Sequence, residues 1–391
     1  MHGGDQIGWD KKEAYQRRID AIRKTKEAQT REKLKFQGYM DTDDYGTIPP
    51  PEGFGWKPKG SSGEFFRAKA WSENFRSLMQ CYPAYIDPND AIAGRTVIFM
   101  SNTRTCSWNP AYSYAFLEED HKKYGIQPGI GADAHFAADY RIGLALGYNG
   151  ILEKVRRYRD YYGEEKREFY DAEESVVLGI KEWIKRNADQ ALEASKIDSD
   201  PIIKSRLEEV WRVCSWVMEN PPRTLHEACQ WIAFFNSASR SYNRDGAGCQ
   251  LDEILRPYYE ADIASGSIDD EDAIFLLACL LLNDPHYYQL GGPDQDGRDL
   301  ISHISFLILE AASRLGSTVN LTVRVHDGLD KEFFRQAVKR LFIHRKGWPR
   351  FAGDKALSEG FARNGYPIEL GRRRIATGCN WMAIPGIEYC M

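Results

Sequence analysis

The most constraining feature of the sequence is a short stretch near its end, Ala-Thr-Gly-Cys-Asn-Trp-Met-Ala-Ile-Pro-Gly at residues 376–386. One cysteine, Cys379, directly follows Gly378, and Pro385 with Gly386 closes the stretch. Glycine frees the backbone at both ends and proline stiffens the return, which predicts a tight loop that displays one thiol. The plain alternative is a cysteine buried in a turn, because free cysteine is among the most buried residue types.

Size and composition exclude several classes of protein. The chain has 391 residues, 42% of them hydrophobic, which is enough for a large core or two domains. A net charge of −5 gives no reason to expect a nucleic-acid partner. The start of the chain lacks an apolar signal region, and the longest apolar run, 273–282, is too short to cross a bilayer, so we expect no membrane partner.

The cysteines indicate a reducing compartment. Eight cysteines without a paired framework are typical of a cytoplasmic protein, so we expect a cytoplasmic location. Neither CxxC nor HExxH occurs in the sequence, so a zinc or iron–sulfur site has little support and we expect no bound metal.

Hydrophobic periodicity predicts a chain of helices with a few short strands. We expect a solvated, peripheral helix within 11–35, followed at 36–58 by a Pro-rich wrap or an ordinary linker. Thr224 and Glu227 predict a capping box at the start of a core helix. The other expected elements are helices at 63–79, 201–218, 269–282 and 331–343, and strands at 96–100 and 321–325.

Three polar stretches have two interpretations each. The stretch 101–108, which contains Arg104, is either pocket lining or a surface loop. The glycines at 129–131 match a dinucleotide loop only weakly, because no apolar strand precedes them. The acids in 294–299 lack the spacing of a calcium loop, so we predict a turn with helix capping.

Several segments of the chain carry a resemblance to a known family. They are Pro-Pro-Arg-Thr-Leu-His-Glu-Ala at 221–228, residues 251–259, Gln-Leu-Gly-Gly at 289–292, Asp-Gly-Arg-Asp at 296–299, residues 305–311, Asn-Leu-Thr-Val-Arg-Val-His at 320–326, Gly-Trp-Pro-Arg-Phe at 347–351, and Gly-Cys at 378–379 with Pro-Gly at 385–386. Together they resemble the glycyl-radical enzymes, the pyruvate formate-lyase superfamily.

The resemblance implies an α/β fold, a ten-stranded barrel made of two five-stranded halves. This chain would supply the first half-barrel and the surrounding helices, with the cysteine loop at the centre. The alternation of helices with short apolar strands agrees with an α/β class. Residues 1–60 would form the peripheral helix and the Pro-rich wrap, and 61–391 an incomplete catalytic domain.

The resemblance also implies cofactors and partners. No Arg-Val-x-Gly-Tyr-like glycyl motif occurs in this chain, so no cofactor is expected on it. The glycyl radical would lie on a missing part, a second chain or C-terminal portion, and a radical S-adenosylmethionine activase would install it. The expected partners are therefore a small-molecule substrate, the glycyl-bearing part and the activating enzyme, in an oligomer. Alone, the chain is expected to be inactive and incompletely buried.

By resemblance, Cys379 becomes the thiyl radical that takes a hydrogen atom from the substrate. The residues expected to bind the substrate are Asn380, Trp381, Arg104, His135 and Gln289. The alternative for His135 is a capping or packing role. Arg104, Gln289 and the run 372–374 are expected either to bind carboxylates or to be surface or strand-edge groups.

The residues after Cys379 bear on the reaction. The dehydratases and the choline lyase of the superfamily carry a glutamate base two residues after the cysteine, where this chain has Trp381, whose indole only donates. Pyruvate formate-lyase has two adjacent cysteines, and here Asn380 follows. The pattern looks most like the aryl- and alkylsuccinate synthases, anaerobic enzymes that add a hydrocarbon to fumarate, with a mainly apolar pocket and no carboxylate base beside the cysteine. Two alternatives stay open: another glycyl-radical lyase, a decarboxylase or dehydratase with its base elsewhere (Glu388 is one option), and a non-catalytic assembly subunit.

Overall fold

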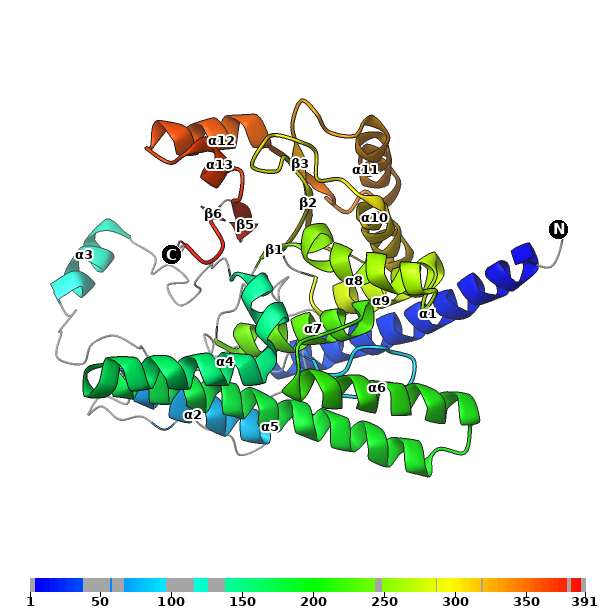
Figure 1. Ribbon diagram of the computed structural model, residues 1–391, viewed down its shortest axis with the longest axis horizontal. Helices are drawn as coiled ribbons and strands as arrows, with labels where there is room; N and C mark the ends of the chain where they lie inside the picture. Colours follow the sequence, from blue (N-terminus) through cyan, green and yellow to red (C-terminus); the bar gives the residue numbers. More distant parts are fainter. Residues whose placement is uncertain are drawn as a thin grey trace.

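The computed structural model describes residues 4–37, 57, 67–95, 116–125, 138–242, 248–285, 287–317, 319–377 and 381–387. Long helices lie side by side in the lower part of Figure 1, and a small sheet with its helices forms the upper part. A two-stranded hairpin near the C-terminal end lies between these two parts. The chain is therefore an α/β protein with more helix than strand.

The helices are α1 (Gly4–Gln37), α2 (Arg67–Cys81), α3 (Phe116–Tyr124), α4 (Tyr140–Tyr162), the short 3₁₀ helix η3 (Gly163–Glu165), α5 (Arg167–Ile197), α6 (Pro201–Glu219), α7 (Leu225–Tyr242), α8 (Leu251–Ser265), α9 (Asp270–Asn283), α10 (His303–Leu315), α11 (Lys331–His344), α12 (Asp354–Arg363) and α13 (Ile368–Gly371). The strands are β1 (Cys249–Gln250), β2 (Tyr288–Gly291), β3 (Leu321–Val325), β4 (Arg350–Gly353), β5 (Ile375–Thr377) and β6 (Trp381–Ala383).

The helical part is organised around α5, which packs against α2, α4 and α6. Trp183 of α5 is fully buried, with its ring edge-on to Tyr82 and Phe234 and its indole N–H donating to the Pro83 carbonyl at 3.0 Å. Aromatic side chains bury much apolar area when their one polar atom has a partner. The tryptophan therefore holds three segments, distant in sequence, in one core.

Helix α1 corrects one prediction. We expected a solvated helix because its sequence is densely charged. Instead Ile19 and Ile22 are fully buried, and the Lys26 ammonium is buried and donates to the Leu282 carbonyl at the end of α9. Helix α1 packs against α9 and α10, so one narrow face of it belongs to the main core. The domain division at residue 60 stays a prediction.

The sheet is parallel, with strand order β1-β2-β3-β4. Its register pairs Gln250 with Gln289 and Gln289 with Thr322, while Arg324 lies opposite Gly291. Because side chains alternate along a strand, these polar residues share one face, and Leu290 with Val323 points to the other face. Within the described part of the chain, β4 pairs only with β3. The predicted strand at 321–325 coincides with β3.

Helix starts largely follow the predicted capping. Thr224 accepts the Glu227 N–H at 3.2 Å, but the Glu227 carboxylate returns to the Arg223 N–H, one residue before the expected position. Helix α9 has a full capping box between Asp269 and Asp272. Capping satisfies backbone N–H groups that have no partner within the helix.

The acidic stretch 294–299 is a turn, as expected. Asp294 accepts the backbone N–H groups of Asp296 and Arg298. The following helix α10 is capped by Ser302 and Ser305, so the predicted capping by these aspartates is wrong. No group of three potential metal ligands occurs among the residues that the structure describes.

Some expectations lie outside the described residues, namely the strand at 96–100, the polar stretch 101–108 and the glycines at 129–131. Of the predicted wrap, residues 36 and 37 belong to α1 and only residue 57 is otherwise described.

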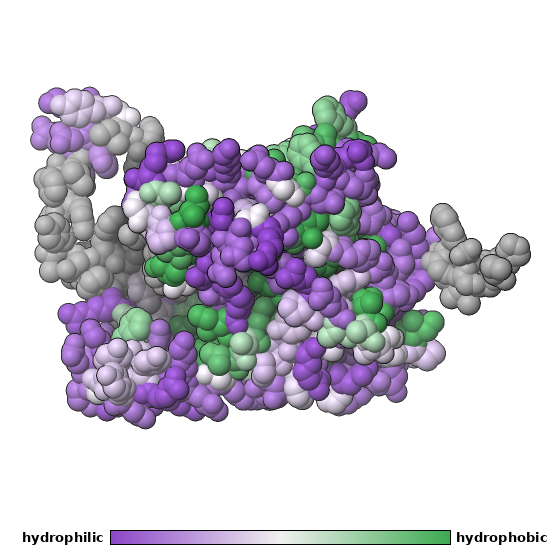
Figure 2. Space-filling view, turned by 45° about the horizontal axis from the view of Figure 1, so that its top comes forward, coloured by the Kyte–Doolittle hydropathy of each residue, from purple (hydrophilic) through white to green (hydrophobic). Residues whose placement is uncertain are grey.

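No described helix is both long and apolar enough to span a membrane. In Figure 2 the visible face is mostly hydrophilic, and hydrophobic residues gather in the hollow between the upper and lower parts.

Gly143 of α4 provides a test of the helix packing. A Cβ atom added there would lie 2.1 Å from the Trp231 ring of α7, and both residues are buried. Gly143→Ala is expected to lower the free energy of unfolding by about 1–3 kcal/mol, the usual cost of overpacking a core. Urea unfolding measures the change.

The matched control is Gly360→Ala in α12, where the added Cβ meets only the end of Arg363 at 3.8 Å. This change is expected to stabilise by about 0.4–1 kcal/mol, because alanine restricts the unfolded chain. Equal effects at the two sites would contradict the packing of α4 on α7.

Candidate functional site

The strands β5 and β6 flank the cysteine stretch and pair antiparallel. Thr377 lies opposite Trp381, and Ile375 opposite Ala383. Ile375 and Ala383 are buried against each other, which fixes the base of the hairpin. Gly378, Cys379 and Asn380 lie outside the described residues. The structure therefore positions the two chain segments that lead into and out of the predicted loop.

The return from the hairpin is fixed against α4. Gly386 has φ +73°, and a Cβ added to it would lie 3.2 Å from Asp139, the N-cap residue of α4. Only glycine adopts this conformation without cost, and here it also permits the close approach. The prediction that a glycine shapes this return is confirmed at Gly386.

A cavity of about 190 Å³ lies beside the hairpin. Its wall includes Ile375 and Pro385 from the hairpin and Gln250 from β1. The charged residues that line it are Asp139, Arg141, Glu253, Asp294, Arg324, Arg372 and Arg373. The expectation of an apolar pocket without a carboxylate does not describe this cavity.

Glu253, in the first turn of α8, is a lining carboxyl group whose pKa is raised into the neutral range. Burial, together with the nearby Asp252 carboxylate, raises the pKa of Glu253 to about 7, although Arg256 lies 2.9 Å away. A carboxyl group with this pKa can accept or donate a proton at neutral pH. Perturbed acids of this kind in a cavity are typical of functional sites.

Asp252 has a structural role next to it. Its buried carboxylate accepts the Gly291 N–H at 2.8 Å and the Ser305 hydroxyl at 2.7 Å, and it also accepts from Gln250 at 3.0 Å. Burial raises the pKa of Asp252, and these hydrogen bonds oppose that shift. Asp252 therefore joins β1, β2 and α10 and also supplies the negative charge that perturbs Glu253.

A buried ion-pair cluster connects the hairpin to the sheet. Asp354, at the start of α12, contacts Arg324 of β3 at 2.7 Å and Arg374, the residue before β5, at 2.9 Å. All three side chains are at most 3% exposed. Burial by itself would raise the pKa of Asp354, but the two guanidinium charges outweigh it and hold that pKa below its usual range.

The three consecutive arginines at 372–374 have different roles. Arg374, next to the start of β5, is buried and binds the Asp354 carboxylate of this chain, so it is not a surface charge. Arg372 donates to the Gln295 carbonyl at 2.7 Å, and its own carbonyl accepts from Arg324. Arg373 is exposed, lines the cavity and has no ion pair with any residue in the described ranges. Its guanidinium group is therefore available to bind an anionic ligand.

The other predicted site residues are less well placed. Arg104, His135, Cys379, Asn380 and Glu388 lie outside the described residues, and for Trp381 the structure gives only the backbone of β6. Gln289 is 2% exposed and does not line the cavity, although it pairs with Gln250, which does. Among the described residues its side-chain nitrogen has no hydrogen-bond partner.

Comparison with known proteins identifies the family. The family described as "Pyruvate formate lyase-like" matches residues 124–391. The chain therefore belongs to the pyruvate formate lyase-like family of glycyl-radical enzymes. The predicted resemblance is confirmed at this level.

Individual relatives are lyases and dehydratases. Isethionate sulfite-lyase of Nitratidesulfovibrio vulgaris is 26% identical over 279 residues, which are 63% of this chain and 34% of the relative. (2S)-3-sulfopropanediol dehydratase of Klebsiella oxytoca is 27% identical over 295 residues, 65% of this chain and 34% of the relative. The chain thus spans about a third of the length of these relatives.

A solved glycyl-radical enzyme from Archaeoglobus fulgidus has a similar fold. Its TM-score to this chain is 0.74 at 18% identity, and the match covers 94% of this chain and 55% of that one. At this identity the likeness shows the glycyl-radical-enzyme fold and no particular activity.

The ionisable residues of the cavity, Glu253 above all, were not predicted from the sequence. The motif at 251–259 drew attention to their segment, but the pKa of Glu253 depends on its buried surroundings.

Glu253→Gln tests the raised pKa. The unfolded chain releases this proton near pH 4.3, the folded protein only near pH 7. Between these values the folded state holds a proton that the unfolded state does not, so stability falls as the pH rises through this window. Glutamine does not titrate, so Glu253→Gln should be more stable than the wild type at pH 8, and the difference should shrink toward pH 5.

Urea unfolding at both pH values measures this difference, with Glu359→Gln as the control at an exposed position of α12. If the difference in unfolding free energy between the wild type and Glu253→Gln does not change with pH, the raised pKa of Glu253 is contradicted.

Asp354→Asn tests the ion-pair cluster. Asparagine leaves two buried guanidinium groups without a counter-charge, so the variant is expected to lose about 3–5 kcal/mol of unfolding free energy. Asp327→Asn is the control, because that side chain is 93% exposed and 3.9 Å from Lys355, and such a pair contributes about 0–1 kcal/mol. If the two variants unfold at the same urea concentration, the cluster does not stabilise the hairpin as described.

Proposed function

We propose that this chain is the thiyl-bearing part of a glycyl-radical lyase or dehydratase, with Cys379 as the residue that abstracts hydrogen. The observation that carries the proposal is the cavity beside the β5–β6 hairpin, because it contains Glu253, whose pKa is raised to about 7. The names of the relatives, a sulfite-lyase and a dehydratase, favour this class over hydrocarbon addition.

Cys379 requires a substrate C–H bond close to its sulfur and a nearby radical store. The S–H bond is comparable in strength to an activated C–H bond, so hydrogen transfer between them is nearly balanced and reversible. A glycyl radical on a second part of the enzyme would supply the unpaired electron. We further propose that a radical S-adenosylmethionine activase installs it and that this chain binds no cofactor itself.

The reaction that fits these groups is an elimination. The substrate carbon that carries a hydroxyl group gives a hydrogen atom to the sulfur of Cys379. Ionised Glu253 then takes the hydroxyl proton, and the leaving group departs from the neighbouring carbon with its bonding electrons. The carbonyl-substituted radical that remains takes the hydrogen atom back from sulfur. The products are a carbonyl compound and the leaving group, and the proton stays on Glu253.

Arg373 suggests an anionic substrate. It is an exposed cation that lines the cavity and has no ion pair with a described residue, and Arg372 lies next to it. A guanidinium group binds planar or branched oxyanions through parallel hydrogen bonds. The two relatives act, by their names, on sulfonates. We propose that the substrate of this chain likewise carries a sulfonate or carboxylate group.

Addition of a hydrocarbon to fumarate is the second candidate. It is favoured by Trp381, which stands where the eliminases of the superfamily have their glutamate base. Arg372 and Arg373 would then bind the carboxylates of fumarate. A base at Glu253 removes the main objection to elimination, so we rank fumarate addition second.

The free edge of the sheet bears on how the catalytic unit is assembled. We propose that β1–β4 form part of the first half of a ten-stranded barrel, and that the glycyl-bearing part supplies the rest. Within the described residues β4 has a free edge, and Phe351 on it is 36% exposed. An open edge of this kind is available for pairing with another strand. The chain alone is therefore expected to be inactive and to associate with the second part.

Cys379→Ser tests the function in the complex of this chain with its glycyl-bearing part. After activation, the variant should retain the glycyl radical signal in electron paramagnetic resonance and show no turnover, because serine cannot form the equivalent radical under these conditions. Isethionate and (2S)-3-sulfopropanediol are the first substrates to assay, because both carry a sulfonate group. Cys81→Ser, at an exposed cysteine on α2, is the control and should keep wild-type turnover.

Turnover in Cys379→Ser would contradict the role of this cysteine. A substituted succinate formed from toluene and fumarate, with no elimination product from any hydroxylated substrate, would contradict the lyase proposal and support the second candidate.

A further inference from the structure

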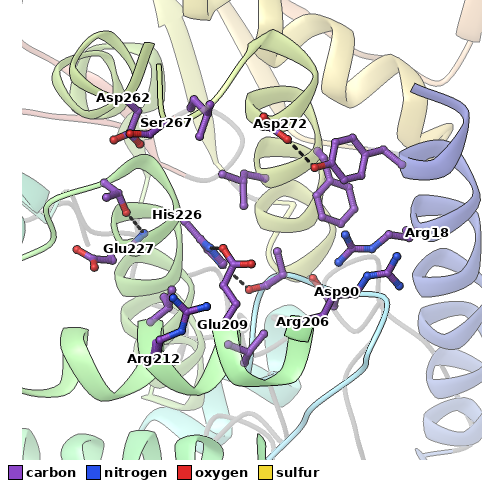
Figure 3. A pocket seen from close by; sticks show the side chains of 18 of the residues that line it. Arg18, Asp90, Arg206, Glu209, Arg212, His226, Glu227, Asp262, Ser267 and Asp272 are labelled. Carbon is purple, nitrogen blue, oxygen red and sulfur yellow. Dashed lines mark hydrogen bonds and ion pairs between the residues drawn. The ribbon is translucent and has the colours of Figure 1, made fainter. Parts of the chain in front are cut away.

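A second cavity, of about 470 Å³, lies between α1, α6, α7, α9 and the segment 82–95 (Figure 3). It shares no lining residue with the cavity beside the hairpin. Its volume is within the range of small-molecule sites, about 300–1,000 Å³. No part of the proposed radical chemistry uses it.

The carboxylates around this cavity already have partners. Glu227 is paired with Arg223 at 2.7 Å, and Asp90 with Arg95 at the same distance. The remaining acids and their partners are Asp262 with the Leu225 N–H, Asp272 with Lys11 and Tyr15, and Glu209 with His226. Each lining acid thus has at least one hydrogen-bond or ion-pair partner within the described part of the chain.

Two arginines of the same cavity have no carboxylate within ion-pair distance among the described residues, although the Asp90 carboxylate lies near enough to Arg18 to oppose the lowering of its pKa. The Nε of Arg18 donates to the Asn89 carbonyl at 3.0 Å, and its guanidinium stacks 4.1 Å from the centre of the Phe275 ring, but it has no ion pair with a described carboxylate. Arg206 has neither a hydrogen bond nor an ion pair with any residue that the structure describes. Figure 3 shows the two guanidinium groups next to each other, one from α1 and one from α6.

This arrangement is unfavourable when the cavity holds only water. Burial lowers the pKa of Arg18, and the like charge of Arg206 lowers it further. Arginine cannot relieve the repulsion by losing its proton, because a guanidinium group stays protonated at neutral pH. An anion between the two groups would relieve it, and the free N–H donors of both guanidinium groups would face that anion.

We propose that this cavity binds the phosphate group of a small molecule, or inorganic phosphate itself, between Arg18 and Arg206. Phosphate suits the pair because it carries up to two negative charges and accepts the parallel hydrogen bonds of a guanidinium fork. Since Arg18 belongs to α1 and Arg206 to α6, the bound phosphate would tie the N-terminal helix to the helical part of the protein. Binding is therefore expected to stabilise the fold.

The test measures thermal unfolding and binding calorimetry with inorganic phosphate, against potassium chloride at the same ionic strength. The wild type should show a phosphate-dependent rise in unfolding temperature that chloride does not reproduce. Arg206→Ala should lower the affinity about tenfold or more, because a hydrogen bond to a charged group contributes about 1.5–3 kcal/mol. Arg17→Ala, an exposed neighbour of Arg18 on the same helix, is the control and should bind as the wild type does.

A second signature separates binding from a structural role. In phosphate-free buffer Arg206→Ala should unfold at a higher temperature than the wild type, because it removes the repulsion of Arg18. If Arg206 only supports the fold, the variant unfolds at a lower temperature, and the proposal is overturned. It is overturned equally if phosphate acts no differently from chloride, or if Arg206→Ala keeps the full phosphate response.

A parallel titration with adenosine monophosphate distinguishes the two sources of phosphate. Affinity at least tenfold above that of inorganic phosphate, and dependent on Arg206, assigns the site to phosphorylated metabolites. Equal affinities assign it to inorganic phosphate.

Discussion

The position of the β5–β6 hairpin depends on one buried carboxylate, that of Asp354. Asp354 lies between Arg324 and Arg374, which come from β3 and from the residue before β5. Without it, two buried like charges would repel at the point where the hairpin joins the sheet. Arg324 extends the same cluster to Gln250 of β1 and to the Arg372 carbonyl. Buried ion pairs add little stability on balance, but removing one partner is costly, so such a cluster strongly favours one arrangement of its segments.

The same part of the sheet places two adjacent carboxyl groups in different environments. Asp252 is surrounded by hydrogen-bond donors from β2 and α10 and serves the fold. Glu253 lines the cavity, and its pKa is raised to about 7 by burial and by the neighbouring charge. The cavity therefore has an acid–base group although Trp381 replaces the usual one.

The sequence predicted the regular elements better than their surroundings. Apolar periodicity located α6, α9 and β3, because a buried stripe or an alternating strand leaves a local pattern. Helix α1 was misjudged because only a narrow face is buried, and Lys26 within that face reads as a surface residue. The run 372–374 shows the same limit: three identical side chains have three environments, which only the tertiary structure defines.

The sequence identified the superfamily to which the site belongs, but it did not predict how the side chains of the site are arranged. The motifs identified the superfamily correctly, and the choice among its reactions rested on the two residues after the cysteine, Asn380 and Trp381. The relatives favour the lyase and dehydratase alternative over fumarate addition. The raised pKa of Glu253 could not be predicted, since it combines burial with the charge of Asp252.

The most direct measurement follows a deuterium label through the reaction. The activated complex of this chain and its glycyl-bearing part is given isethionate or (2S)-3-sulfopropanediol deuterated at a hydroxyl-bearing carbon, C1 in the diol, and the product is analysed by mass spectrometry. The account predicts deuterium on the carbon that the leaving group has left, because the sulfur of Cys379 takes the label and returns it there. A product that has lost this deuterium to the solvent would contradict hydrogen-atom transfer through Cys379.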